Sequence, residues 1–202
     1  MHVVLAIVAG LACSVLALIA RADEITEQLD QAKTYYEEGD VGGALGELEF
    51  AMQALRGKLS ASLRETFPAA PAGWTAVDDG EQGGAALPMM GGNVVQRTYT
   101  QDGGEARIEA SLMSGGGFMQ GLASMFMNPA MLAAQPNAKR IRVGRESGVV
   151  IFDPADRSGR LMVDLGGKIS LMLQGEHLDG PEAMTTLVEG WDLKKVKELA
   201  GL

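Results

Sequence analysis

The chain has 202 residues and a formal charge of −9, with 47 % hydrophobic and 21 % charged residues. This composition is typical of a folded protein of one ordinary-sized core and differs from that of a disordered chain. The 17 basic residues are scattered and outnumbered by 26 acidic ones. Nucleic acid and anionic membrane surfaces are therefore disfavoured as partners, because binding to either requires clustered Lys and Arg.

The first 22 residues have the pattern of a secretory signal peptide. Every residue from Val3 to Ala20 is apolar or small, and Ala20-Arg21-Ala22 gives the small-x-small pattern that signal peptidase accepts. We therefore expect cleavage after Ala22 and a periplasmic location for the mature protein. Because Met1-His2 carries no Lys or Arg, an uncleaved N-terminal anchor is the alternative, and we expect membrane contact only in that case.

The single cysteine, Cys13, lies inside this leader. Gly10 stands where a lipoprotein signal usually has Leu, and the apolar run continues through Ile19. We therefore interpret Cys13 as a small apolar residue of the leader. Its removal leaves a protein without a disulfide, a thiol nucleophile or a thiolate metal site.

Helical spacing of apolar residues begins after the leader and predicts two helices between Glu24 and Leu63. Gly39 can take the left-handed conformation that ends the first helix, and Asp40 can cap the second. The predicted hairpin occupies residues 23–66. The apolar positions that define it are Ile25, Leu29, Ala32, Tyr36, Ala44, Leu48, Ala51 and Leu55.

The stretch from Ala32 to Ala51, with Tyr35-Tyr36-Glu37-Glu38-Gly39-Asp40 at its centre, resembles one tetratricopeptide unit. It departs from that pattern at Arg56, where a Pro usually ends the second helix. No second copy follows, although repeat arrays need about three units to bury a continuous core. A hairpin packed on its own domain is therefore preferred to a peptide-binding array.

Short alternating runs after Pro68 and Gly73-Trp74 predict a sheet domain over residues 67–202. Two paired-glycine turns, Gln101-Asp102-Gly103-Gly104 and Leu165-Gly166-Gly167-Lys168, predict tight hairpins and hence antiparallel neighbours. The predicted strands are Val94–Thr100, Ala106–Leu112, Lys139–Val143, Val149–Phe152, Leu161–Asp164 and Ile169–Gln174.

Two helices are predicted to close the chain. One begins at Pro181 and places Met184 and Leu187 on one face, and the other is capped by Asp192 and turns Val196 toward the sheet. The predicted fold class is α+β, with an N-terminal helical hairpin, a twisted antiparallel sheet covered by helices, and a Met- and Gly-rich helical insertion at residues 114–136.

Three features of the sheet domain carry a further resemblance: Gly73-Trp74, Asn128-Pro129-Ala130-Met131 and the C-terminal helix from Asp192-Leu193-Lys194-Lys195. In these the chain is similar to a group of envelope proteins of Gram-negative bacteria that also carry a Met- and Gly-rich insertion. The resemblance covers most of the mature chain. It implies an envelope location and no particular activity.

The residues that most enzyme chemistries need are sparse. After cleavage only His177 remains, in a predicted surface loop, so a zinc site or a Ser-His-Asp triad lacks its usual ligands or partners. The glycines at residues 115–117 precede no phosphate-binding motif. Adjacent acids such as Glu37-Glu38 and Asp78-Asp79 point different ways in regular structure and indicate solvated faces. A carboxylate-based hydrolase is thus the least favoured alternative.

The exceptional segment is the Met-rich insertion, which is apolar nearly all round a helix. Simple burial in the core is one interpretation. A second is an adaptable surface for a protein, a peptide or a lipid, made by Phe118, Leu122, Met125 and Phe126. A third is Cu(I) binding through the thioethers of Met119, Met125, Met127 and Met131, because soft ligands select soft metals.

The sequence as a whole predicts a non-enzymatic periplasmic protein that binds a protein or peptide, or a lipid, through an apolar Met-rich surface. Cu(I) is the one cofactor that the residues suggest, through the methionines just named.

Overall fold

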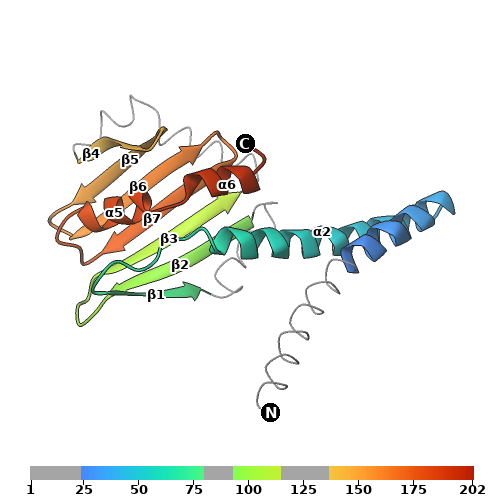
Figure 1. Ribbon diagram of the computed structural model, residues 1–202, viewed down its shortest axis with the longest axis horizontal. Helices are drawn as coiled ribbons and strands as arrows, with labels where there is room; N and C mark the ends of the chain where they lie inside the picture. Colours follow the sequence, from blue (N-terminus) through green and yellow to red (C-terminus); the bar gives the residue numbers. More distant parts are fainter. Residues whose placement is uncertain (1–23, 80–92, 115–136) are drawn as a thin grey trace, which may run out of the picture. The chain divides into compact units, whose positions relative to one another are not determined.

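The computed structural model describes residues 24–79, 93–114 and 137–202, which form two helices, a seven-stranded antiparallel sheet and two C-terminal helices. The predicted α+β class is therefore confirmed (Figure 1). The predicted Met-rich helix and the leader lie outside the described residues. The chain forms two compact units, Met1–Leu59 and Ser60–Leu202, which we call the helical unit and the sheet unit.

The helical unit contains a first helix at residues 24–37 and most of helix α2, Val41–Arg64. The turn between them is the predicted one. Gly39 takes a φ of +84°, and the Asp40 backbone N–H donates to the Tyr35 carbonyl at 2.8 Å. The Asp40 carboxylate then caps α2 by accepting from the Gly43 N–H at 2.9 Å. Both roles assigned to Gly39-Asp40 are confirmed.

Three alanines and one isoleucine form the interior of the helical unit. The buried apolar residues there are Ile25, Ala32, Ala44 and Ala51. A Cβ added to Gly43 would come within 3.1 Å of the Tyr35 ring, so this glycine also allows close approach. Contact through alanine and glycine brings helix axes near one another but buries little apolar area per residue.

The sheet unit is built on one seven-stranded sheet in the order β1-β2-β3-β7-β6-β5-β4. Every pairing is antiparallel, as predicted from the glycine turns. The strands are β1 Trp74–Asp79, β2 Asn93–Gln101, β3 Arg107–Ser114, β4 Ala138–Val143, β5 Glu146–Asp153, β6 Ser158–Leu165 and β7 Ile169–Glu176.

Six of these strands correspond to the predicted runs, and β1 is an addition to them. It follows Gly73, whose φ of +78° turns the chain into the strand. Gly103, Gly166 and Gly167 also have positive φ at the predicted hairpin turns.

Strand β3 pairs with β7, so the insertion that follows β3 connects an inner strand with the edge strand β4.

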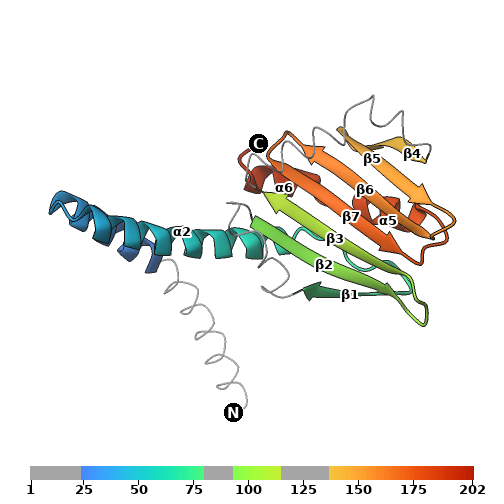
Figure 2. The ribbon, with the colours of Figure 1, turned by 180° about the vertical axis from the view of Figure 1, so that it is seen from behind.

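Helices α5, Glu182–Glu189, and α6, Leu193–Leu199, cover one face of the sheet (Figures 1 and 2). Asp192 caps α6 by accepting from the Lys195 N–H at 2.9 Å, as predicted. Helix α5 approaches the sheet at two glycines that face each other across β6 and β7, Gly159 and Gly175. A Cβ at Gly159 would lie 2.6 Å from Met184 Cε, and one at Gly175 would lie 2.3 Å from Leu178 Cδ1.

We predict that Gly175→Ala destabilises the sheet unit by about 1 to 3 kcal/mol, because the added methyl overpacks the contact with Leu178 and Met184. Denaturant unfolding followed by Trp fluorescence measures the change. Gly190→Ala is the matched control, because its new Cβ meets nothing closer than 3.5 Å and should change stability by no more than about 0.5 kcal/mol. Equal stability of the two variants would contradict this account of the glycine pair.

Candidate functional site

The residues predicted to form the site fall within the insertion, outside the described residues. They are Met119, Met125, Met127 and Met131 for the metal, and Phe118, Leu122, Met125 and Phe126 for the partner surface. The structure therefore leaves both hypotheses as predictions.

Among the described residues, exposed large apolar side chains gather on the helical unit. Only Val77 and Leu202 of those found exposed belong to the sheet unit. The exposed fractions on the helical unit range from 44 % at Leu29 and Leu48 to 69 % at Tyr36. Soluble proteins keep contiguous exposed apolar patches small unless they bind something, so this concentration marks a candidate site.

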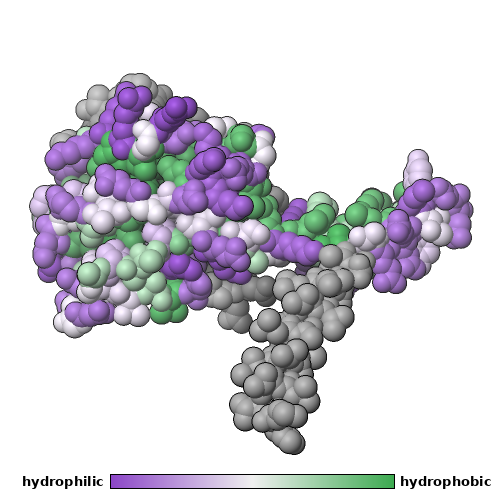
Figure 3. All heavy atoms as spheres, viewed as in Figure 1, coloured by the Kyte–Doolittle hydropathy of each residue, from purple (hydrophilic) through white to green (hydrophobic). Residues whose placement is uncertain are grey.

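Five of these side chains form one line along α2: Val41, Leu45, Leu48, Met52 and Leu55. Their spacings are four, three, four and three residues, which place them on one face of the helix. We call this set the α2 stripe. Figure 3 shows hydrophobic surface along part of this helix. The side chains are between 44 % and 57 % exposed, so each keeps about half of its surface in water.

The stripe differs from the apolar face expected from the sequence. The helical pattern grouped Ala44 and Ala51 with Leu48 and Leu55, yet the two alanines are buried and the two leucines are exposed. The alanines lie on one side of the leucine line, about 60 to 80° round the helix. The packing of the unit therefore uses the alanines and leaves the leucines in solvent. Periodicity alone does not reveal which of the two sets is buried.

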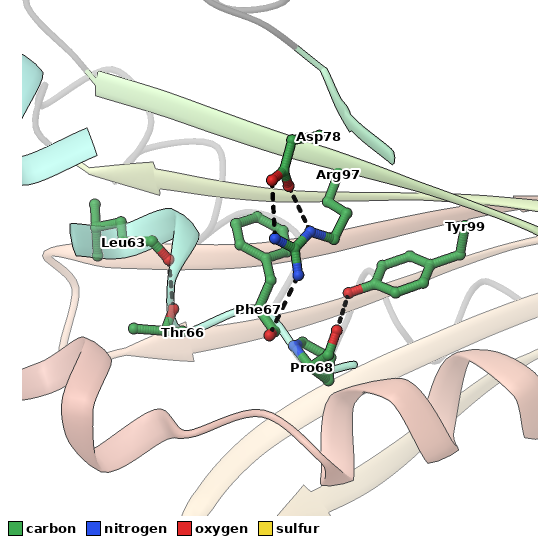
Figure 4. A network of polar contacts seen from close by, with 7 residues as sticks. All are labelled: Leu63, Thr66, Phe67, Pro68, Asp78, Arg97 and Tyr99. Atoms are coloured by element: carbon green, nitrogen blue, oxygen red, sulfur yellow. Dashed lines mark hydrogen bonds and ion pairs between the residues drawn. The ribbon is translucent and has the colours of Figure 1, made fainter. Parts of the chain in front are cut away.

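The sheet unit holds a different feature, a polar network around the segment that follows α2 (Figure 4). Arg97 on β2 binds both carboxylate oxygens of Asp78 on β1, with Nη2 3.0 Å from Oδ2. The same guanidinium lies 5.2 Å from the centre of the Phe67 ring and donates to the Phe67 carbonyl at 3.4 Å. The hydrogen bond with Asp78 raises the pKa of Arg97.

Two further hydrogen bonds hold this segment. The hydroxyl of Tyr99, which is fully buried, donates to the Pro68 carbonyl at 2.7 Å. Trp191 Nε1 donates to Thr66 Oγ1 at 3.2 Å, and its ring lies 4.5 Å from that of Phe67. Every polar group in these contacts bonds to backbone or to a fixed partner, so we assign the network to stability and not to catalysis.

A groove of about 370 Å³ opens where β5, β6 and β7 lie together. Its polar side chains are Asp153, Ser158, Arg160, Gln174 and Glu176. Asp153 already accepts from the Ala155 N–H at 2.9 Å, a bond that helps to form the turn between β5 and β6. The groove combines two acids with one arginine, which suits a solvated polar surface.

The remaining chemical candidates occupy loops and strands. His177 is exposed, with a φ of +55°, in a loop where Arg157 donates to its carbonyl at 3.0 Å and to Asp179 at 2.6 Å. In the described part of the chain, no three His, Cys, Asp or Glu side chains are grouped to hold a metal ion. Within the same residues, no helix has the length and apolar character needed to cross a membrane.

Comparison of the chain with family models, with curated proteins and with solved structures yields no match. Among the described residues, the α2 stripe is the most distinctive candidate for a binding surface.

Tyr99→Phe should destabilise the sheet unit by about 1 to 3 kcal/mol at neutral pH, because it leaves the buried Pro68 carbonyl without its donor. Burial raises the pKa of Tyr99 from 10.0 to about 12. The folded state thus holds this proton more tightly, and the resulting stability is present below pH 10 and lost as the pH rises toward 12.

The destabilising effect of Tyr99→Phe should therefore shrink between pH 10 and pH 12. Unfolding followed by Trp fluorescence at several pH values measures the difference between variant and wild type. Tyr36→Phe serves as the control, since Tyr36 is 69 % exposed. A difference that stays constant across this interval would contradict the assigned role of the buried hydroxyl.

Proposed function

We propose that this protein is a non-enzymatic component of the bacterial cell envelope that binds a protein or peptide partner. The observation that carries the proposal is the α2 stripe, five half-exposed apolar side chains in one line. Burying the exposed half of a Leu side chain is worth roughly 1 kcal/mol. A partner that covers the whole stripe therefore gains several kcal/mol before the costs of association.

A protein partner suits this surface better than a lipid bilayer. The chain carries a formal charge of −9, and the edge of the stripe on α2 holds one acid, Glu49, and one base, Arg56. An amphipathic helix that binds an anionic membrane usually has Lys and Arg on its polar face. An apolar line without a row of cations beside it favours a protein groove or another helix.

The envelope address rests on the leader at residues 1–22, with its small-x-small pattern before Asp23. The Met-rich insertion would offer a second adaptable surface through Phe118, Leu122, Met125 and Phe126. In this proposal the helical unit supplies a regular, fixed contact line, while the insertion supplies contacts that adapt to the partner.

We predict that Leu48→Glu combined with Leu55→Glu abolishes partner binding without unfolding the protein, because a charge at either position cannot be buried without a counter-ion. The measurement is co-purification from envelope fractions, with the N-terminus and the bound proteins identified by mass spectrometry. Phe50→Glu is the matched control, because Phe50 is 60 % exposed but lies about 200° round the helix from Leu48. Retention of the same partner by the double variant would overturn the proposal.

Cu(I) binding is the second candidate function. Met162 and Met172 face each other across β6 and β7, while Met113 lies on the same face of the adjoining strand β3, so thioethers also gather on the sheet. If the insertion binds Cu(I), replacing Met125, Met127 and Met131 by Leu should remove binding while circular dichroism stays unchanged. Replacing Met162 and Met172 by Leu tests the sheet thioethers separately as ligands. Unchanged Cu(I) affinity in the insertion variant would rule out those methionines as ligands.

A further inference from the structure

We infer that the partner of the α2 stripe is the same stripe of a second copy of this chain, paired in antiparallel orientation. This inference rests on the proposed function and names the partner at that same surface. It draws on the spacing of the stripe, on the charges beside it and on the thin interior of the helical unit.

The spacing of the stripe selects a helix as the partner. Side chains that recur at alternating intervals of four and three residues form the seam of a helix pair, in which each knob enters a hole on the facing helix. An extended peptide would need a spacing of two residues, and a flat surface would need no strict repeat. From Val41 to Leu55 the alternation is unbroken, and Leu59 continues it.

One edge of the stripe carries an acid and a base, so the edges of two copies can form ion pairs with each other. Glu49 and Arg56 are seven residues apart, so they lie on the same edge of the stripe, and both are exposed. Arg56 Nη2 lies 3.7 Å from Met52 Sδ, which places the guanidinium directly alongside the stripe. Two such edges can match only if the helices run in opposite directions.

One antiparallel register brings these features together. When Met52 of one copy lies beside Leu55 of the other, Leu48 lies beside Leu59 and Glu49 lies across from Arg56. The twofold axis repeats each contact, so Leu48, Met52, Leu55 and Leu59 of both copies are covered and both charge pairs form. A parallel pairing would instead place Glu49 near Ala44, without a charge to balance it.

The interior of the helical unit is completed by such a pairing. Ala32, Ala44 and Ala51 bury little area, and two helices alone form only half of a bundle. Joining two hairpins at these positions sets α2 of each copy against α2 of the other and forms a leucine-rich interior between them. The second copy thus supplies the large apolar contacts that the alanines do not provide within one chain.

The experiment is sedimentation velocity of the purified protein over about 1 to 100 μM, a range that resolves micromolar dimers. The wild type should dimerise, and Leu48→Glu should raise the dimer dissociation constant at least about tenfold. Phe50→Glu should leave it unchanged within about twofold. Circular dichroism and Trp fluorescence verify that each variant is folded.

Charge exchange tests the orientation. Glu49→Arg should weaken the dimer by setting two cations across from each other, and Glu49→Arg combined with Arg56→Glu should restore it. A monomeric wild type, or a dimer unaffected by Leu48→Glu, would overturn the inference. If Glu49→Arg combined with Arg56→Glu does not restore dimerisation, the antiparallel register is overturned. Binding of a different envelope protein by a monomeric chain would leave the proposed function intact.

Discussion

The helical unit depends on one packing constraint, the use of alanine and glycine where its helices meet. Ala32, Ala44 and Ala51 are buried, whereas the leucines of α2 are half exposed. Since a chain gains most from burying its largest apolar side chains, this arrangement leaves much of the available hydrophobic energy unused. The unused part forms one straight line along α2, which makes it suitable for a partner of regular structure.

The sheet unit follows the opposite rule and buries its large side chains. Four leucines of the sheet are fully buried: Leu112, Leu161, Leu171 and Leu173. The glycine pair of β6 and β7 lets α5 pack closely, and the network of Tyr99 and Arg97 fixes the segment that follows α2. The hydrogen bonds of this network end on backbone carbonyls or on fixed side chains, so the network orders the chain without providing a reactive group.

Much of the fold was predictable because local signals agreed with it. Gly39-Asp40 and Asp192 cap helices as their residue types suggest, and the paired glycines make the hairpin turns. Strand β1 was not predicted, because a six-residue segment after Gly73 gives a weak alternating signal. The order of the sheet, with β3 beside β7, depends on pairings between distant residues that no local pattern encodes.

The candidate site was less accessible from sequence. Periodicity showed that one side of α2 is apolar but could not show that Ala44 is buried and Leu48 exposed, since both fit one helical face. The alternating spacing of four and three residues was the one sequence signal that could have indicated the stripe. The methionines and aromatic residues of the insertion were conspicuous in composition, and their role stays a prediction.

In this proposal the α2 stripe is open in the free chain and covered in its complex. Peroxide oxidation followed residue by residue by mass spectrometry measures this at Met52, which is 46 % exposed, against the fully buried Met184 in the same sample. Met52 should oxidise much faster than Met184 in dilute protein, and its oxidation should slow when the partner is bound. Equally slow oxidation of both methionines in dilute protein would contradict the proposal.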